Sequence, residues 1–352
     1  MIPVYISSHG FGHVTRCLAI VEEILETTDN EICLVSGDSQ VQFSMAYLAR
    51  FSTRVTYHNI ITDVGLINEE GKLTVDKEAL SKRLNTYIDD FESIVSDEVE
   101  FLKDKDVRCI LTDITCLGIE VAKRLNVKSI ATTNFTWLEQ YSFLELDSRI
   151  LDFFEDEYSK IDYVLLYDLA TVEFKSFIVR HQIKILKKVG LVARHTEADK
   201  VRNLKKIYEK PVFVSFGRST NMNTINIDYD GSIISTAGTN LEVKGRHIEL
   251  MQNTLDTQNF IAASELVISK AGWGTIAEAL VAGVPLVLVE REGVLEDTHH
   301  IKLLKEENLC VSIKEDELKN LNINKLRVAV SSLSKDIRGN NTKEVVRSIL
   351  SV

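Results

Sequence analysis

The sequence has 352 residues, of which 45% are apolar and 26% charged, and its formal net charge at pH 7 is −11. This length exceeds the size at which one hydrophobic core usually stops growing, so we expect two domains. The acidic balance, with a pI near 5.3, argues against nucleic acid as the main partner and against electrostatic binding to anionic membranes.

The cysteines also narrow the class of protein. The five cysteines, at positions 17, 33, 109, 116 and 310, lie in apolar segments without a CxxC pair. This pattern favours buried, reduced thiols over a disulfide framework or a zinc site. The N-terminus has no secretory pattern, and no run reaches the roughly 18 apolar residues of a membrane span. We therefore expect a cytoplasmic protein without an integral membrane segment.

Strand-like apolar runs alternate with helical patterns along the first half of the chain. The runs lie at 4–7, 32–36, 55–59, 109–112, 129–133 and 163–166. A long amphipathic helix, with Leu80, Leu84, Ile88 and Phe91 on its apolar face, separates the third run from the fourth. This alternation of strands and helices predicts a parallel sheet covered on both faces.

A polar, lysine-rich stretch at 194–211 separates this half from the next. We place the domain boundary there, with domains at 1–195 and 196–338, and expect a hinge in the same stretch. The second half is predicted to have strands at 212–216, 232–236, 266–269 and 286–289, and helices at 275–282 and near 297–307, 323–333 and 342–350.

The most informative stretch is 267–300, which predicts a strand, a glycine turn, a helix and another strand in succession. Gly272 and Gly274 allow a tight turn before the helix. The N–H groups at the start of that helix, together with its positive end, favour an anion. Glu278, one turn into the helix, is placed to accept hydrogen bonds from ribose hydroxyls. An ordinary βαβ crossover explains the same pattern, so the stretch alone leaves both interpretations open.

In the first half of the chain, a histidine and an aspartate also stand where a strand passes into a helix. Gly10 and Gly12 bend the chain after the first strand and place His13 at the start of a helix. A helix N-terminus disfavours the charged imidazole, so His13 is suited to accept a proton. Asp113 ends a strand and can accept the His13 N–H and fix its tautomer. The alternatives are a capping or solvated histidine and an aspartate that caps its own helix. We expect Arg16 to be solvated or structural, or to contact a phosphate.

Four ordered motifs extend over most of the chain: GFGH, ILTDITCLGIEVAKRLNVKSIATTN, PVFVSFGRS and SKAGWGTIAEALVAGVPLVLV. Together they resemble the GT-B glycosyltransferases that use nucleotide-diphosphate sugars, especially the UDP-glycosyltransferase and family 28 groups. The resemblance implies an α/β fold of two Rossmann-like, doubly wound parallel-sheet domains that face a cleft. It also implies a C-terminal helix, within 339–352, that crosses back to the first domain.

The resemblance further implies an inverting transfer in which His13 deprotonates the acceptor hydroxyl and Asp113 holds His13. The donor is a nucleotide-diphosphate sugar, UDP-linked in the relatives, and the acceptor is a small molecule or a glycan. Glu278 takes the place of the family's ribose-binding glutamate, and Glu296 and Asp297 that of its acidic sugar-recognition pair. The residues implied to bind the nucleotide sugar are Gly10, Gly12, Gly217, Arg218, Ser219, Lys270, Ala271, Gly272, Gly274, Thr275, Glu278, Glu296 and Asp297.

Several positions depart from the family pattern. Lys270 replaces the phosphate-binding histidine, Arg218 stands where serine is usual, and the turn at 290–297 differs, which leaves the donor sugar open. The loop SSHGFGHVTR is also similar to the glycosyltransferase-like half of some plant sugar kinases and to a UDP-sugar hydrolase of the same fold. A hydrolase in which His13 activates water, and a noncatalytic sugar-nucleotide-binding protein, are therefore alternatives. The acceptor would be set by loops at 62–74 and 135–147.

Two rival motifs are weaker. Asp228, Tyr229 and Asp230 have the DxD form that binds manganese in another glycosyltransferase architecture, but an exposed turn in a polar loop explains them better. Without a metal, protein donors must stabilise the departing diphosphate, and we expect no metal and no cofactor. A nicotinamide site is disfavoured because Thr15 occupies the third glycine position of that fingerprint.

Overall fold

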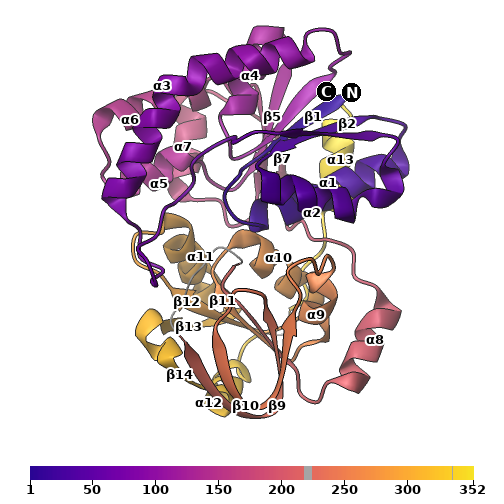
Figure 1. Ribbon diagram of the computed structural model, residues 1–352, viewed down its shortest axis with the longest axis vertical. Coiled ribbons are helices and arrows are strands. Elements are labelled where there is room, and N and C mark those ends of the chain that lie inside the picture. Colours follow the sequence, from indigo (N-terminus) through magenta and orange to yellow (C-terminus); the bar gives the residue numbers. More distant parts are fainter. Residues whose placement is uncertain (218–223, 335) are drawn as a thin grey trace. The chain divides into compact units, whose positions relative to one another are not determined.

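Two parallel β-sheets, each covered by helices, make up the computed structural model, which describes residues 1–217, 224–334 and 336–352 (Figure 1). The predicted α/β class is confirmed. The first unit contains Met1–Ile67, Val75–Gly190 and Asn341–Val352, and the second contains Asn68–Thr74 and Leu191–Asn340. The sequence-based boundaries at 195 and 338 stay predictions of where the functional domains divide.

The sheet of the first unit has its strands in a Rossmann-like order. This order is β3 (Val55–Asn59), β2 (Ile32–Ser36), β1 (Ile2–Ile6), β4 (Cys109–Asp113), β5 (Lys128–Thr133), β6 (Tyr163–Tyr167) and β7 (Lys184–Val189). All neighbouring strands are parallel. The order reverses between β1 and β4, and a sheet of this kind binds ligands outside the carboxyl ends of its strands at that point.

Helices cover both faces of this sheet. They are α1 (Gly12–Thr27), α2 (Asp38–Tyr47), α3 (Lys77–Leu102), α4 (Leu117–Leu125), α5 (Trp137–Phe143), α6 (Ser148–Ser159), α7 (Val172–Arg180) and α13 (Thr342–Ile349), with a 3₁₀ turn at Ala49–Phe51. Figure 1 shows α13 beside α1, and the two helices contact each other. Gly118 lets α4 approach β1, since a Cβ there would lie 2.9 Å from the Tyr5 ring. No helix among the described residues is long and apolar enough to span a bilayer.

The second unit repeats the same winding. Its strand order is β10 (Leu241–Leu250), β9 (Ile225–Thr236), β8 (Val212–Ser215), β11 (Leu266–Lys270), β12 (Leu286–Glu290) and β13 (Cys310–Lys314), with β14 (Asn320–Asn322) paired to β9. Its helices are α8 (Ala198–Ile207), α9 (Thr257–Ala263), α10 (Trp273–Ala282), α11 (Leu295–Glu306) and α12 (Ile323–Val330), with a 3₁₀ turn at Glu315–Lys319. Here the order reverses between β8 and β11.

The strands β9 and β10 depart from a simple Rossmann unit. They pair in parallel along their whole length, with Leu241 opposite Ile225 and Leu250 opposite Thr236. Because only residues 237–240 connect these two strands, each strand must fold back on itself for the parallel pairing to form. The register shifts beside Gly245, which has φ +129°, and a Cβ there would lie 2.3 Å from the Tyr229 carbonyl oxygen. Glycine is therefore required at the bend of β10.

The secondary structure differs from the sequence-based expectation in a few places. The stretch 194–211, expected to be a linker and hinge, contains α8 and lies inside the second unit. The strands β7, β10, β13 and β14 were not anticipated. In β7 and β10 the side chains are mostly exposed or partly exposed, so these strands lack the apolar run that identified the others.

A short arm at 68–74 connects the first half of the chain to the second unit. Its ends pair through the Asp76 N–H, which donates to the Ile67 carbonyl oxygen. The Leu73 side chain is fully buried in the core of the second unit, among residues such as Val212 and Ile225, and the Leu73 N–H donates to Glu315 Oε1. The arm therefore supplies part of the core of a unit that is otherwise built from residues 191–340.

We expect Leu73→Ala to destabilise the second unit by ~2–5 kcal/mol, because it removes a buried side chain and leaves a cavity. Hydrogen exchange should rise in peptides from β8 and β9 and stay unchanged in peptides from β1 and β4. Lys72→Ala, at an exposed neighbour, is the matched control and should have little effect. Equal exchange in Leu73→Ala and the wild type would show that the arm does not stabilise this core.

Candidate functional site

The candidate residues of the first unit lie at the carboxyl ends of β1 and β4, where the strand order reverses. His13 is the second residue of α1, and Asp113 is the last residue of β4. Gly10 has φ +69° and forms the turn between β1 and α1. Since β1 and β4 pair directly, with Ile6 opposite Asp113, the chain brings the aspartate beside the start of α1.

His13, Asp113 and Arg16 form one hydrogen-bonded cluster. The Nδ1 atom of His13 lies 2.8 Å from Asp113 Oδ1, and the His13 side chain is 11% exposed. Arg16 donates from Nε to Asp113 Oδ2 and from Nη2 to Oδ1, both at 2.5 Å. The Asp113 side chain is fully buried, and Arg16 is 3% exposed. The sequence placed His13 and Asp113 together, but the option of a solvated Arg16 is wrong.

The ionisation of Asp113 follows from this cluster. Burial by itself would raise the pKa of Asp113, but the charge and hydrogen bonds of Arg16, with a further contribution from His13, lower it to about 2. Asp113 does not cap its own helix, because the residue at the N-cap of α4 is Cys116. It is therefore an ionised, buried carboxylate that serves Arg16 and His13.

A second buried carboxylate, Asp63, lies near the same cluster. It accepts hydrogen bonds from the Ser8 N–H at 2.9 Å and from Trp137 Nε1 at 2.8 Å. Burial raises the pKa of Asp63, and its hydrogen bonds and the nearby His13 partly oppose this. The Trp137 ring contacts both His9 and His13. Sequence reasoning missed Asp63, because it follows β3 in a loop without periodicity.

The aromatic residues of the expected acceptor loop at 135–147 are mostly core residues. Phe135, Trp137 and Tyr141 are at most 2% exposed, whereas Phe143 is 46% exposed. Packing therefore accounts for the first three. Trp137 combines this packing role with direct contact to the histidines of the first unit.

In the second unit the candidate residues follow β8 and β11, again where the strand order reverses. Gly217, with φ +93°, comes just after β8, and Lys270 is the last residue of β11. A Cβ at Gly217 would lie 3.4 Å from Lys270 Nζ, so the glycine leaves room for the amine. Among the residues that the structure describes, Lys270 has neither a hydrogen-bond nor an ion-pair partner. Arg218 and Ser219 lie outside the described residues.

The helix α10 begins immediately after this lysine. Gly272 is its N-cap in an extended conformation, and no side chain caps it. Ala271 is buried, and Gly274 and Thr275 are in the first turn. This is the arrangement of backbone N–H groups and helix dipole that favours an anion.

Glu278 is held by an arginine that the sequence analysis did not connect with it. Arg194 Nε donates to Glu278 Oε1 at 2.8 Å, and the two side chains are 1% and 8% exposed. The same guanidinium donates to the Leu255 carbonyl oxygen and to Thr257 Oγ1. These bonds fix the position of one Glu278 oxygen.

Asp297 is held in the same way. Arg291, after β12, donates from Nε and Nη2 to the two Asp297 oxygens, both at 2.6 Å, and Asp297 is 1% exposed. The neighbouring His300 bonds through Nδ1 to the Ala271 carbonyl oxygen at 2.8 Å, and its Nε2 lies 4.0 Å from Glu296. A direct contact between Asp297 and a sugar stays a prediction, and Arg291 is the residue that shields this carboxylate.

Burial and then the nearby Arg291 lower the pKa of Lys270 to about 8, although Asp297 and Glu296 oppose the shift. An unpaired amine whose charge is disfavoured gains from a bound anion. The three arginines 16, 194 and 291 share no motif in the sequence. Arg16 was named in the sequence analysis without its partner, whereas Arg194 and Arg291 were missed. The partner of Arg194 lies 84 positions away, and nothing in the sequence marks Arg291 as buried.

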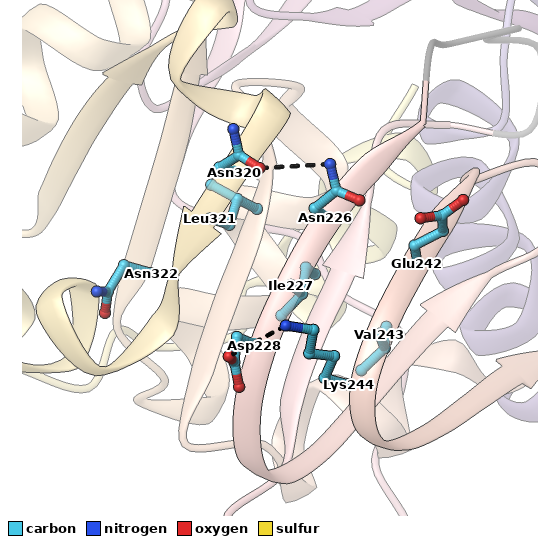
Figure 2. Close-up of a pocket in the computed structure, with 9 residues that line it drawn as sticks. All are labelled: Asn226, Ile227, Asp228, Glu242, Val243, Lys244, Asn320, Leu321 and Asn322. Atoms are coloured by element: carbon cyan, nitrogen blue, oxygen red, sulfur yellow. Dashed lines mark hydrogen bonds and ion pairs between the residues drawn. The ribbon is translucent and has the colours of Figure 1, made fainter.

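The DxD residues do not form the expected exposed turn, since they lie within β9. Asp228 lines a groove of about 580 Å³. Figure 2 shows Asp228 facing Lys244 there, with Asn226 beside Asn320. Asp228 is 82% exposed and lies 4.0 Å from Lys244, whereas Tyr229 is buried on the other face. Within the described residues no three His, Cys, Asp or Glu side chains are grouped to hold a metal.

Known structures identify the fold of the whole chain. Phytolacca americana UGT2, complexed with UDP-2fluoro-glucose and pterostilbene, superimposes with a TM-score of 0.61 at 13% identity, over 99% of this chain and 93% of that one. The protein therefore has the GT-B fold, as the sequence motifs indicated.

The sequence identifies the family of the second half. Residues 190–346 match the glycosyltransferase family 28 C-terminal domain. L-arabinokinase from Arabidopsis thaliana is 25% identical over 311 residues, which are 82% of this chain and 28% of the plant protein.

A bacterial transferase is similar to a shorter part of the chain. The UDP-N-acetylglucosamine--N-acetylmuramyl-(pentapeptide) pyrophosphoryl-undecaprenol N-acetylglucosamine transferase of Borreliella burgdorferi is 30% identical over 162 residues, 41% of this chain and 45% of that protein. The chain thus spans less than half the length of either of these curated relatives.

We expect the affinity for UDP to fall as the pH rises through about 8, because Lys270 then loses the charge that attracts phosphate. The fall should approach about tenfold per pH unit at higher pH if only the protonated amine binds. Calorimetric titration between pH 7 and 9.5 measures it. Lys270→Arg, which stays charged, should bind with little pH dependence, and Lys270→Met should bind weakly throughout. A parallel fall in all three proteins would exclude Lys270 as the titrating group.

Proposed function

We propose that this protein is an inverting glycosyltransferase that moves a sugar from a UDP-linked donor to a hydroxyl of a small-molecule or glycan acceptor. The observation that carries the proposal is the contact of 2.8 Å between His13 Nδ1 and the buried Asp113. It lies at the carboxyl ends of β1 and β4, where a fold of this kind binds ligands. A neutral imidazole held in this way has its second nitrogen available as a base.

His13 is the general base in the proposed reaction. Its Nε2 takes the proton from the acceptor hydroxyl, and the oxygen keeps the electron pair and attacks the anomeric carbon. The bond from that carbon to the diphosphate breaks, and UDP leaves with the bonding electrons. A single displacement inverts the configuration of the anomeric carbon. Asp113 stabilises the imidazolium that results.

The second unit holds the donor in this proposal. The diphosphate is surrounded by Lys270, by Gly217 and by the N-terminus of α10 with Ala271, Gly272, Gly274 and Thr275. Glu278 accepts hydrogen bonds from the ribose hydroxyls. Arg218 and Ser219, which lie outside the described residues, are also assigned to phosphate binding. Gly10 and Gly12 leave space beside His13, and Glu296 with the Arg291–Asp297 pair faces the sugar. The positive charge of Lys270 and the helix end offset the charge of the leaving group, so the proposed reaction is metal-independent.

The names of the similar proteins support a UDP-linked donor. The Phytolacca americana structure contains UDP-2fluoro-glucose together with pterostilbene, and the Borreliella burgdorferi relative is named for UDP-N-acetylglucosamine. The match to the family 28 C-terminal domain supports donor binding by residues 190–346. Hydrolysis of the donor requires the same base acting on water, and noncatalytic binding requires only the second unit.

We expect His13→Ala to lower the rate of sugar transfer by ~10²–10⁴-fold with UDP affinity nearly unchanged, since it removes the base and leaves the donor site intact. Incubation with UDP-sugars and a panel of hydroxyl acceptors, followed by mass spectrometry, measures transfer. His181→Ala is the control, because His181 also pairs with a carboxylate, Glu155, at 3.0 Å. Full activity in His13→Ala would refute the assignment of the base.

The same assay without an acceptor separates the alternatives. Transfer predicts UDP release that depends on the acceptor. Free sugar and UDP formed from the donor alone would show a hydrolase, and binding without either product would show a noncatalytic protein.

A further inference from the structure

The Nδ1 atom of His13 has two neighbours whose hydrogen-bonding roles are fixed and opposite. It lies 2.8 Å from Asp113 Oδ1 and 2.9 Å from Arg16 Nη2. An ionised carboxylate only accepts, and a guanidinium only donates. Because Nδ1 carries either a proton or a lone pair, a bond to one neighbour excludes a bond to the other. The proton of the neutral ring is therefore on Nδ1 when Asp113 is the partner, and on Nε2 when Arg16 is the partner.

Arg16 is held firmly in this position. Its fork contacts both oxygens of Asp113, and its Nη1 lies 3.3 Å from Asn134 Oδ1. The guanidinium carbon is 5.6 Å from the centre of the Tyr167 ring. Both Asp113 oxygens thus receive charged N–H donors from Arg16, and much of the negative charge that would otherwise act on His13 is neutralised.

We propose that Arg16 is a positioning residue that, by sharing Asp113 with His13, decides which imidazole nitrogen carries the proton and how far into acid the ring stays unprotonated. The inference rests on the proposed function, in which Nε2 of His13 accepts the acceptor proton. Only the tautomer with its proton on Nδ1 has a lone pair on Nε2. When the hydroxyl O–H bond breaks and the Nε2–H bond forms, the imidazolium lies between the Asp113 carboxylate, which stabilises it, and the Arg16 cation, which opposes it.

Other titratable groups surround His13. On α1, Cys17 donates to Asp113 Oδ2 at 3.2 Å, and burial raises the pKa of its thiol. Asp63, in the loop after β3, interacts with the charge of His13, and Tyr167 approaches Arg16 from β6. His9, in the loop before α1, contacts the same Trp137 ring as His13. These residues are the same in every variant at position 16, although the charge of Arg16 also acts to lower the pKa of Asp113, Cys17 and Tyr167. A comparison of variants at position 16 therefore measures the effect of Arg16 on His13, both direct and through these groups.

The tautomer of His13 can be measured without any substrate. Proteins labelled with ¹⁵N-histidine are titrated by NMR, with His13→Gln used to assign the signals of His13. In Arg16→Met we expect more of the Nδ1–H tautomer, and a titration midpoint higher by at least half a pH unit, about threefold in proton affinity. Arg16→Lys keeps the cation and should titrate close to the wild type. Arg16→Gln keeps N–H donors but loses the charge, so it should show the same rise in the titration midpoint and serves for that readout if Arg16→Met does not fold.

Arg124→Met is the matched control, because Arg124 also bonds carboxylates in the first unit, Glu92 and Glu120, but on its surface. It should leave the His13 titration unchanged. Identical tautomers and midpoints in the wild type and in the folded neutral variants would overturn the proposal.

The pH dependence of kcat/KM for transfer is the second readout. In the neutral variants, the fall of kcat/KM on the acid side of the pH profile should move to higher pH by the same amount as the NMR midpoint. If Arg16 had a purely structural role, its loss would lower kcat/KM equally at every pH and would not shift this fall. The NMR result does not depend on turnover. A shifted titration in a protein that transfers no sugar would therefore reject the proposed function and retain the assignment of Arg16.

Discussion

The buried negative charge of Asp113 is the constraint on which the first unit depends. An ionised carboxylate without access to water is stable only with charged or hydrogen-bonded partners around it. Asp113 is fully buried and takes its partners from α1, where Arg16 and His13 are one turn apart. The pairing therefore fixes the start of α1 against the end of β4. It places the imidazole at the point where the order of the strands reverses.

A buried carboxylate paired with an arginine also occurs twice in the second unit. Glu278 is bound by Arg194, and Asp297 is bound by Arg291, with each pair nearly or fully buried. Of the four site carboxylates that the sequence pointed out, Asp113, Glu278 and Asp297 are each held by an arginine, whose planar fork matches a carboxylate better than lysine does. Lys270 is different, because within the described residues no carboxylate pairs with it. Lys270 lies beside Gly217 and the N-terminus of α10, where an anion is favoured.

The resemblance to known proteins has a clear limit in this chain. The family match covers residues 190–346, which are almost wholly in the second unit. The first unit holds the proposed base, the buried Asp63 and the Trp137 side chain that joins them. In the proposed reaction the acceptor binds to the first unit, which the family match hardly covers. The plant L-arabinokinase has a segment similar to most of this chain, and that segment is 28% of its length.

The sequence by itself determined the buried strands and the residues at their ends. The expected run at 55–59 coincides with β3, a partly exposed edge strand. The expected run at 32–36 coincides with β2, because a parallel strand that is buried on both faces needs a continuous apolar segment. His13, Asp113 and Lys270 were found because each stands where such a strand passes into a helix. The edge strands β7 and β10 were missed, since exposed strands carry no such apolar signal.

The tertiary structure alone decided how these residues are paired. Arg16 and Asp113 are 97 positions apart, and Arg194 and Glu278 are 84 apart. In a sequence, an arginine that will be buried looks the same as one on the surface, and only folding brings its distant partner near. The bend in β9 and β10 and the insertion of Leu73 likewise arise from packing between distant segments. Local periodicity therefore located the site, and the burial of charge established how its residues are connected.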